Sequence, residues 1–440
     1  MKYLFENLSN KKVLILGFGR EGQSNYRLLR QEYPKILISI ADIKNIEIKG
    51  DENTTLYLGE KYLDNICDFD YIIKSPGIPF GKELIEAKRK GIEITSQTKI
   101  FFEKCCGQII GVTGTKGKST TSTLIYQILK ENGLKTFLVG NIENPSLEAL
   151  ASNNGEDVVF VYELSSQQLA DLDKSPQISI VLNVGVDHLD WHGSREEYVN
   201  AKKNIVRYQT ISDFAILNSD DQIARDFAKS TKAKVVYFSK SFLENKFKQR
   251  FFLRGEHNLE NIAAIVAVAR ILKIKDEIIL GVLSTFKGLE HRLEWVREVG
   301  RINFYNDSAS TNQTSVKAAV NSFNEPITLI MGGYDRGINY DELAEYLSKI
   351  VNLKTILLIG QIGDKIKKSL EKAEYKGKML SLGKNSMEII VKTAFENTAN
   401  GGVVLLSPAA ASFDMFKNYK DRGNQFKKAV VLLGTQYERK

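Results

Sequence analysis

The sequence predicts an α/β protein in which mainly parallel sheets are covered by helices. Short apolar runs alternate with longer amphipathic stretches, and two glycine-rich turns each join an apolar run to a helical stretch. The chain of 440 residues is also too long for one ordinary core. With 43% hydrophobic and 26% charged residues, the composition is that of a folded soluble protein. We therefore expect several domains of one structural class.

Ten apolar runs are predicted to be strands buried on both faces of their sheets. Each is rich in Val and Ile and is bounded by Gly, Asn or Pro, as is typical of parallel sheets. The stretches between them predict helices. The runs are residues 13–16, 71–73, 109–112, 158–161, 178–182, 214–217, 302–305, 327–331, 355–359 and 403–406.

Three blocks repeat this strand–helix pattern and define the predicted domains, residues 1–106, 107–290 and 291–440. The second block begins at a new glycine-rich turn, and the third begins near His291. The net charge of +8 is spread along the chain, without the basic, aromatic-interleaved stripe of a nucleic-acid-binding protein. No apolar stretch reaches the ~18 residues of a membrane span, and the N-terminus lacks a secretory signal. We expect a cytoplasmic protein that neither inserts into membranes nor binds nucleic acid.

The first glycine turn follows the run KKVLIL and has the form Gly17-x-Gly19-x-x-Gly22. Such a turn lets the backbone approach a diphosphate at a helix N-terminus. Asp42 follows about twenty residues later and could accept a hydrogen bond from a ligand hydroxyl or imide. The turn alone fits NAD, FAD or a nucleotide sugar, or a tight turn without a ligand.

The second turn, residues 111–120, reads GVTGTKGKST and resembles a phosphate-binding P-loop. Its backbone N–H groups would surround phosphates, Lys118 would contact the outer ones, and Ser119 would bind Mg²⁺. Val112 stands where the strict motif has its first glycine. A phosphate-binding loop nevertheless remains the favoured interpretation, because the rest of the motif joins a strand to a helix.

Polar residues follow two further strands of this block. Glu163 ends one strand and is a candidate Mg²⁺ ligand, although an exposed strand-end carboxylate fits the pattern too. Asp187 and His188 follow the next strand, and three polar strand ends in one block favour a site. In the helical stretch 194–209, Lys202 shares a partly apolar face. Its pattern alone favours a surface lysine that extends into solvent.

The order of these and later motifs resembles that of the Mur ligases, in particular the branch that joins glutamate to UDP-N-acetylmuramoyl-L-alanine. The resemblance covers essentially the whole chain. The matching segments are GVTGTKGKSTT, ELSSQQ, NVGVDHLDWHG, YVNAK, GEHNLENIAA, HRLE, NDSASTN, GGYDRG and SPAAASFDMFKNYKDRG, together with the first glycine turn and KSPG. It implies an N-terminal Rossmann-like domain for the UDP substrate, a central P-loop ATPase and a C-terminal Rossmann-like domain for the amino acid.

The resemblance also implies roles for residues at matching positions. Catalytic roles fall on Lys118, Glu163, His188 and Lys202. ATP would be bound by Gly114, Thr115, Lys116, Gly117, Lys118, Ser119, Thr120, Asn258, Asn261, Arg292 and Asp307. The UDP substrate would be bound by Gly17, Phe18, Gly19, Arg20, Asp42, Ser75, Gly77, Asn141 and Gln168. Glutamate would be bound by Thr311, Arg336, Ser412, Phe413 and Tyr419.

Two Mg²⁺ ions are implied as cofactors, one held by Ser119 and Glu163 and the other by His188 and Lys202, with Lys202 carbamylated by CO₂. The implied reaction is ATP-dependent ligation through an acyl phosphate, a cytoplasmic step of peptidoglycan synthesis, by a monomer. D-glutamate is the expected amino acid. Ala309 and Arg336 stand where the family usually has lysines. The alternative is therefore ligation of L-glutamate, followed by separate epimerisation.

Two hypotheses from other classes remain. An NAD-dependent oxidoreductase would explain the first turn but leaves the P-loop and the third block unexplained. A non-catalytic nucleotide-binding homologue is disfavoured because Ser119, Glu163, His188 and Lys202 are all present.

Overall fold

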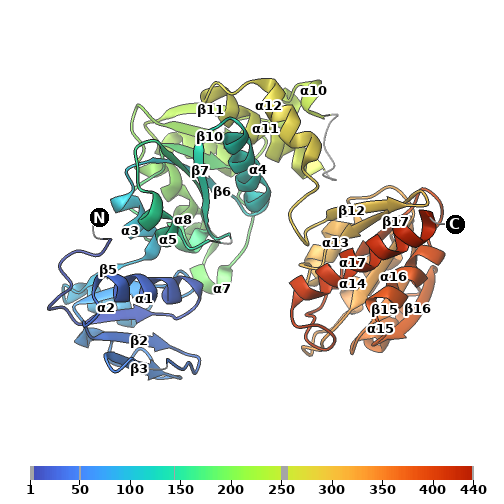
Figure 1. The fold of residues 1–440 in the computed structure, drawn as a ribbon, viewed down its shortest axis with the longest axis horizontal. Coiled ribbons are helices and arrows are strands. Elements are labelled where there is room, and N and C mark those ends of the chain that lie inside the picture. Colours follow the sequence, from blue (N-terminus) through green and yellow to red (C-terminus); the bar gives the residue numbers. More distant parts are fainter. Residues whose placement is uncertain (1–3, 49–50, 143, 249–255, 439–440) are drawn as a thin grey trace. The chain divides into compact units, whose positions relative to one another are not determined.

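The computed structural model describes residues 4–48, 51–142, 144–248 and 256–438. Helices cover three sheets, and all but one pair of neighbouring strands run parallel (Figure 1). The α/β prediction is therefore confirmed. The chain forms two compact units, Met1–Asn245 with Leu259–Val282, and Lys246–Asn258 with Leu283–Lys440. Of the helices in the described part of the chain, none is long and apolar enough to cross a membrane.

The first sheet has the strand order β3-β2-β1-β4-β5, and every neighbouring pair is parallel. Because β1 and β4 are neighbours, the turns that follow them meet at one edge of the sheet. Ser75 Oγ, after β4, donates a hydrogen bond to Gly17 O, after β1, at 2.8 Å. The strands are β1 Val13–Leu16, β2 Ile38–Asp42, β3 Thr54–Leu58, β4 Tyr71–Lys74 and β5 Glu93–Thr95. The helices are α1 Arg20–Glu32, α2 Lys82–Arg89 and α3 Gln97–Lys104, with a 3₁₀ turn at Ile66–Asp68.

The second sheet has the order β11-β10-β9-β6-β8-β7 and is parallel throughout. Its strands are β6 Gln108–Thr113, β7 Lys135–Gly140, β8 Val158–Glu163, β9 Ile178–Val181, β10 Phe214–Asn218 and β11 Lys234–Phe238. The helices are α4 Lys118–Glu131, α5 Ser146–Asn153, α6 Ser166–Leu169, α7 Leu189–His192, α8 Arg195–Arg207, α9 Gln222–Asp226, α10 Asn245–Lys248, α11 Glu256–Ile271 and α12 Asp276–Thr285, with 3₁₀ turns at Phe227–Ser230 and Lys240–Phe242. The neighbours β8, β6 and β9 bring the P-loop, Glu163 and the His188 segment to one edge.

The first two sheets belong to one unit and share a buried cluster to which helix α3 contributes Phe101. The Phe101 ring of α3 lies 5.1 Å from the Phe160 ring and 5.0 Å from the Tyr162 ring of β8, measured between centroids. Both contacts are edge-to-face, the geometry that aromatic pairs favour. These rings belong to a continuous buried cluster that also includes Val13 and Ile40 of the first sheet. The polar groups at the edges of the two sheets are therefore held by one core.

The third sheet has the order β12-β13-β17-β14-β15-β16, and only the β12–β13 pair is antiparallel. Its central neighbours β13, β17 and β14 are followed by the NDSASTN, SPAAAS and GGYDRG segments, which therefore share one edge. The strands are β12 Glu294–Val299, β13 Ile302–Asn306, β14 Ile327–Gly332, β15 Leu353–Ile359, β16 Lys378–Gly383 and β17 Val403–Leu406. The helices are α13 Gln313–Val320, α14 Asp341–Ser348, α15 Gly363–Lys372, α16 Met387–Glu396 and α17 Tyr419–Glu438.

Candidate active site

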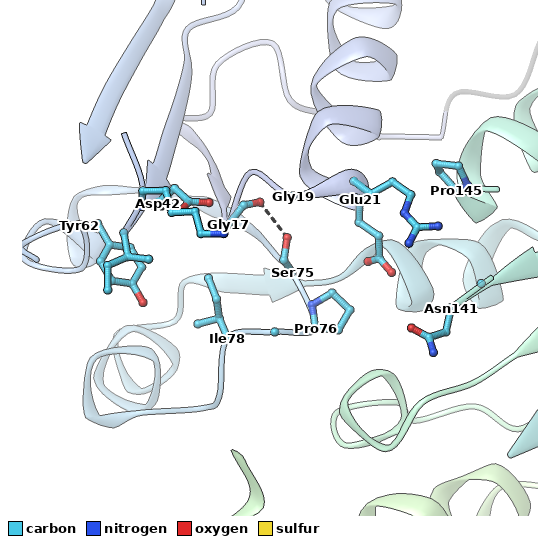
Figure 2. A pocket seen from close by; sticks show the side chains of 15 residues that line it. Gly17, Gly19, Glu21, Asp42, Tyr62, Ser75, Pro76, Ile78, Asn141 and Pro145 are labelled. Carbon is cyan, nitrogen blue, oxygen red and sulfur yellow. Dashed lines mark hydrogen bonds between the residues drawn. The ribbon is translucent and has the colours of Figure 1, made fainter. Parts of the chain in front are cut away.

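The first glycine turn opens into a pocket of about 480 Å³, here called the N-terminal pocket (Figure 2). Its walls come from the turns after β1, β2 and β4 and from the end of β7. Seven of the residues predicted to bind the UDP substrate line it: Gly17, Gly19, Arg20, Asp42, Ser75, Gly77 and Asn141. Of the other two, the Phe18 ring packs edge-on against Tyr26 at 5.9 Å, and Gln168 contacts the pocket residue Glu21.

The local geometry of this turn requires glycine. Gly17 has φ +87°, and a Cβ on Gly22 would overlap the carbonyl oxygen of Gly17. Asp42 braces the turn, because its Oδ2 accepts from the Phe18 N–H at 2.6 Å and its Oδ1 from the Lys44 N–H at 2.8 Å. Helix α1 begins at Arg20 without a side-chain cap. The pocket therefore contains an uncapped helix N-terminus, which favours an anionic ligand.

The P-loop joins β6 to α4, and its conformation also depends on glycine. Gly117 has φ +85°, and a Cβ there would overlap Asn261 Oδ1 of α11. Asn183, after β9, braces the loop: its carbonyl oxygen accepts from the Thr115 N–H at 2.9 Å, and its Oδ1 accepts from the Lys116 N–H at 2.8 Å. The structure thus places Asn261 beside the P-loop. Asn258 lies one turn earlier in α11, and both asparagines are buried.

Two lysine amines meet at one carbonyl oxygen of this loop. Lys118 Nζ donates to Gly114 O at 2.8 Å, and Lys202 Nζ donates to the same oxygen at 3.0 Å. Lys202 is 1% exposed, and its Nζ lies 4.9 Å from the centre of the Tyr198 ring. Burial, and then the charge of Lys118, hold the pKa of Lys202 well below its usual range. The interpretation of Lys202 as a surface lysine is therefore wrong, because helix α8 packs this face against the sheet.

Glu163 is 1% exposed, so the alternative of an exposed strand-end carboxylate is also wrong. Its Oε1 accepts from Asn141 Nδ2 at 3.1 Å. Its Oε2 is buried and has no hydrogen-bond partner within the described part of the chain. An unpaired buried carboxylate oxygen suits a hard cation. The oxygen has lost its hydration on burial, and a bound cation would compensate the negative charge.

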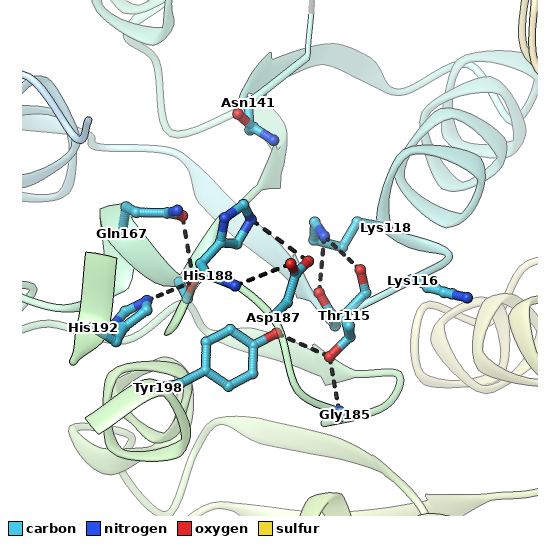
Figure 3. A network of polar contacts seen from close by, with 12 residues as sticks. Thr115, Lys116, Lys118, Asn141, Gln167, Gly185, Asp187, His188, His192 and Tyr198 are labelled. Carbon is cyan, nitrogen blue, oxygen red and sulfur yellow. Dashed lines mark hydrogen bonds and ion pairs between the residues drawn. The ribbon is translucent and has the colours of Figure 1, made fainter. Parts of the chain in front are cut away.

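A second pocket, here called the central pocket, has a volume of about 300 Å³ and is lined by Lys118, Asp187, His188, Tyr198 and Lys202. Figure 3 shows polar contacts that Lys118, Asp187, His188 and Tyr198 make in this region. His188 is half-exposed, adopts a left-handed backbone with φ +50°, and places Nε2 3.6 Å from Asp187 Oδ2. Tyr198 OH and Thr115 Oγ1 are hydrogen-bonded at 2.9 Å. The two pockets adjoin, because Pro76, Gly77 and Asn141 line both.

The described residues include no group of three or more His, Cys, Asp or Glu side chains that could hold a metal ion. A cation in the central pocket would need other oxygen ligands, such as the Ser119 hydroxyl in the first turn of α4, a carbamate on Lys202, or a phosphate. Mg²⁺ fits this donor set, because it commonly takes one or two protein carboxylates and completes its shell with phosphates and water.

In the third sheet, Asp307 joins two of the motif loops. Its Oδ2 accepts from Ser407 Oγ at 2.7 Å and its Oδ1 from the Leu293 N–H at 3.2 Å. Burial raises the pKa of Asp307 to about 6, although these hydrogen bonds and the neighbouring Arg292 favour the ionised form. Arg292 itself is exposed.

The residues predicted to bind glutamate lie on loops of this same sheet edge. The GGYDRG loop contacts the SPAAAS loop through a hydrogen bond from the Tyr334 N–H to Ala411 O at 2.8 Å. Phe413 is 60% exposed and its ring packs edge-on against Tyr334 at 6.4 Å. Arg336 is exposed. Thr311 lies on the NDSASTN loop, Ser412 is buried, and Tyr419 begins α17.

Sequence reasoning missed two residues that organise these sites. Glu21 lines the N-terminal pocket, but it occupies a variable position of the glycine motif, where the pattern sets no residue type. Arg422 is fully buried and donates to Ser308 and Ala410, on the NDSASTN and SPAAAS loops. Only its place in a matching segment could have singled it out, because a lone arginine in a helix ordinarily faces solvent.

Comparison with known proteins agrees with the motifs. Residues 112–253 match the Mur ligase middle domain, and residues 291–410 match the Mur ligase glutamate ligase domain. The UDP-N-acetylmuramoylalanine–D-glutamate ligase of Acetivibrio thermocellus is 41% identical over 97% of both chains. The enzyme of the same name from Clostridioides difficile is 37% identical over 96% of this chain and 99% of its own.

Solved structures share the fold at low identity. MurC from Thermotoga maritima, a UDP-N-acetylmuramate–alanine ligase, superimposes with a TM-score of 0.56 at 19% identity, over 96% of this chain and 100% of its own. MurF from Thermotoga maritima, solved in complex with ADP, gives 0.55 at 18% identity over 100% of both chains. Given a relative that is 41% identical over 97% of both chains and two matching family domains, this chain belongs to the Mur ligase family.

Proposed function

We propose that this Mur ligase joins D-glutamate to UDP-N-acetylmuramoyl-L-alanine and converts ATP to ADP and phosphate. The observation that best supports this proposal is the junction of the two pockets at Pro76, Gly77 and Asn141. A substrate whose UDP group lies in the N-terminal pocket could extend its alanyl carboxylate into the central pocket. There it would meet Lys118 of the P-loop. Relatives bearing this enzyme name support the same substrate.

A carboxylate is a poor acyl donor, so it must first be activated. In the proposed reaction the alanyl carboxylate attacks the γ-phosphorus of ATP, the bond to ADP breaks, and an acyl phosphate forms. The neutral amine of glutamate then attacks the acyl carbon, the C–O bond to phosphate breaks, and the nitrogen loses one proton as the amide forms and inorganic phosphate leaves. The proposed role of Lys118 is to neutralise the phosphate oxygens that crowd together during transfer. Residues 114–120 with Asn258, Asn261, Arg292 and Asp307 would bind ATP.

Two Mg²⁺ sites fit the residues present. Ser119 and Glu163 would hold one ion, which accounts for the unpaired Glu163 Oε2. His188 and a carbamylated Lys202 would hold the other, because a buried, neutral amine can react with CO₂ to form an anionic ligand. Bound Mg²⁺ would supply positive charge against the phosphate and acyl oxygens.

The chirality of the amino acid depends on the loops of the third sheet. Thr311, Arg336, Ser412, Phe413 and Tyr419 are proposed to bind glutamate, and the exposed Arg336 can pair with a carboxylate in bidentate fashion. D-glutamate is proposed because the 36–41% identical relatives are named as D-glutamate ligases. L-glutamate is the second candidate, because Ala309 and Arg336 stand where the family usually has lysines.

We further propose the domain limits 1–106, 107–290 and 291–440, and a monomeric cytoplasmic enzyme. The limits of the second and third domains are supported by the two family matches, which begin at residues 112 and 291.

The test is phosphate release from ATP and Mg²⁺ with UDP-N-acetylmuramoyl-L-alanine, comparing D- with L-glutamate. Release with D-glutamate alone supports the proposal, release with L-glutamate alone transfers it to the second candidate, and no release with either amino acid refutes both. Lys202→Ala should abolish turnover and Lys202→Arg should not restore it. The matched control is Lys203→Ala, one residue away on a more exposed face, which should retain activity.

A further inference from the structure

The carboxyl group of Glu21 lies where an anionic ligand is expected. Glu21 is the second residue of α1, at the uncapped helix N-terminus, and it lines the N-terminal pocket. Figure 2 shows its side chain directed toward Pro76 and Asn141, the residues at the junction with the central pocket. An ionised carboxylate at this place would repel a diphosphate, since like charges in a partly dehydrated site raise each other's energy.

The hydrogen bonds of Gln168 fix which oxygen of Glu21 acts as an acceptor. Gln168 Oε1 accepts from the Ser165 N–H at 3.0 Å in a capping box, so its amide cannot turn over without losing this bond. Its Nε2 therefore faces Glu21 and donates to Oε1 at 2.9 Å. Glu21 Oε2 is buried and has no hydrogen-bond partner among the described residues. This arrangement suits a neutral carboxylic acid, with Oε1 as the carbonyl oxygen and Oε2 as the hydroxyl.

The charged groups around Glu21 do not remove this preference. Lys74 of β4 and Arg20 of α1 favour the ionised form, and Asp171, after α6, opposes it. Lys74 Nζ is engaged elsewhere, donating to Ile78 O at 3.0 Å and lying 3.8 Å from Asp171 Oδ2. Tyr162 of β8, the other nearby titratable group, is buried, and burial keeps its hydroxyl protonated. Burial is the largest influence and raises the pKa of Glu21 to about 7.

We propose that Glu21 is a specificity-determining residue that recognises the diphosphate-bearing substrate as a neutral acid, donating the Oε2 proton to a substrate oxygen. The inference deepens the proposed function and depends on its UDP substrate. Binding then requires the protonated form, so above neutral pH Glu21 takes up a proton from solution as the substrate binds. A carboxylate would instead select against the diphosphate, and the turn would bind its ligand through backbone N–H groups alone.

The test measures the Kd of UDP-N-acetylmuramoyl-L-alanine by calorimetry between about pH 6 and pH 8.5. The competent fraction of an acid that titrates near pH 7 falls by about 30-fold over this range, which sets the largest expected rise in Kd. At about pH 8, in buffers of different ionisation enthalpy, wild-type binding should take up close to one proton. Glu21→Gln, which stays neutral and can still donate, should bind with a Kd that varies little with pH and without proton uptake.

The matched control is Glu83→Gln. Glu83 is the second residue of α2, also follows a glycine N-cap, and is exposed. It should keep the wild-type pH profile. A wild-type rise in Kd of at least about fivefold that only Glu21→Gln abolishes supports the inference. A smaller rise, or one that Glu21→Gln retains, overturns it. If the wild type binds the UDP substrate at no pH, the proposed function fails as well, so the two failures are distinguishable.

Discussion

Replacement of Arg422 by Met tests whether one buried side chain holds the amino-acid loops in place. The guanidinium is fully buried, donating from Nε to Ser308 Oγ at 3.0 Å and from Nη2 to Ser308 O at 2.9 Å. Both terminal nitrogens also donate to Ala410 O at 3.1 Å. Ser308 Oγ in turn donates to Tyr419 O at 2.8 Å. One residue thus links the NDSASTN loop, the SPAAAS loop and the start of α17.

The size of the effect follows from the groups left unpaired. Met fills a similar volume, but three buried acceptors on Ser308 and Ala410 lose their donors, each at about 1–3 kcal/mol. Against this, the mutation removes a buried cation. Burial lowers the pKa of Arg422 from 12.5 to about 10, which corresponds to roughly 3 kcal/mol. We expect a net loss of about 3 kcal/mol in unfolding free energy, or a Tm about 6–12 °C lower for this unit.

The assay combines thermal unfolding with steady-state kinetics. Arg422→Met should raise the KM for glutamate by an order of magnitude or more, because the loops lose their mutual register, while the affinity for the UDP substrate stays unchanged. Arg422→Lys keeps the charge but not the planar guanidinium, so its Tm and its KM for glutamate should lie between those of the wild type and Arg422→Met. The control is Arg297→Met in the same unit, whose partly exposed ion pair with Glu438 is worth under about 1 kcal/mol. Unchanged stability and glutamate KM in Arg422→Met would refute the reasoning.

Three further predictions concern the other sites. Gly117→Ala should weaken ADP binding at least about tenfold by calorimetry, because its Cβ would overlap Asn261 Oδ1. The control is Gly133→Ala, which should bind ADP normally. Gly133 also has a positive φ, +82°, but a Cβ there would meet open space. Equal affinities would contradict this. Since burial raises the pKa of Asp307 to about 6, its stabilising contribution is full below about pH 4 and is lost as the pH rises through 6. Between about pH 4 and pH 7, the unfolding free energy of the wild type, measured in urea, should fall by up to about 3 kcal/mol more than that of Asp307→Asn. Parallel pH profiles of the two proteins would argue against this role of Asp307. Glu163→Gln should weaken ADP binding with Mg²⁺ by about 10-fold or more but leave metal-free ADP binding unchanged, and an equal loss under both conditions would rule out a metal role.

The strands that the sequence predicted are inner strands, and the ones it missed lie mostly at the edges. All ten predicted runs are strands, buried on both faces, so their apolar residues are continuous. The six edge strands β3, β5, β7, β11, β12 and β16 were not among the predicted runs. Many of their side chains are half-buried or exposed, as in β16, which has no buried residue, and such strands have neither a continuous apolar run nor a clean period of two.

The candidate site was predictable where chemistry and chain position coincide. Glycine turns and strand-end acids mark a sheet edge, and the structure gathers Lys118, His188 and Lys202 there. The burial of Lys202 was not predictable from the pattern of its helix, because the P-loop that covers it is 88 residues away in sequence. Glu21 and Arg422 were missed for a similar reason. Their roles depend on contacts with Gln168 and Ala410, on segments that periodicity does not connect.

The left-handed backbone of His188 restricts which residues could replace it. At φ +50° the β-branched residues are strained, and glycine or asparagine is tolerated best, yet neither has an imidazole nitrogen. Backbone geometry and side-chain chemistry thus both narrow the choice of residue at this position. A drug that binds the His188 ring would meet few viable resistance mutations, since a replacement that suits the backbone would remove the group the enzyme is proposed to need.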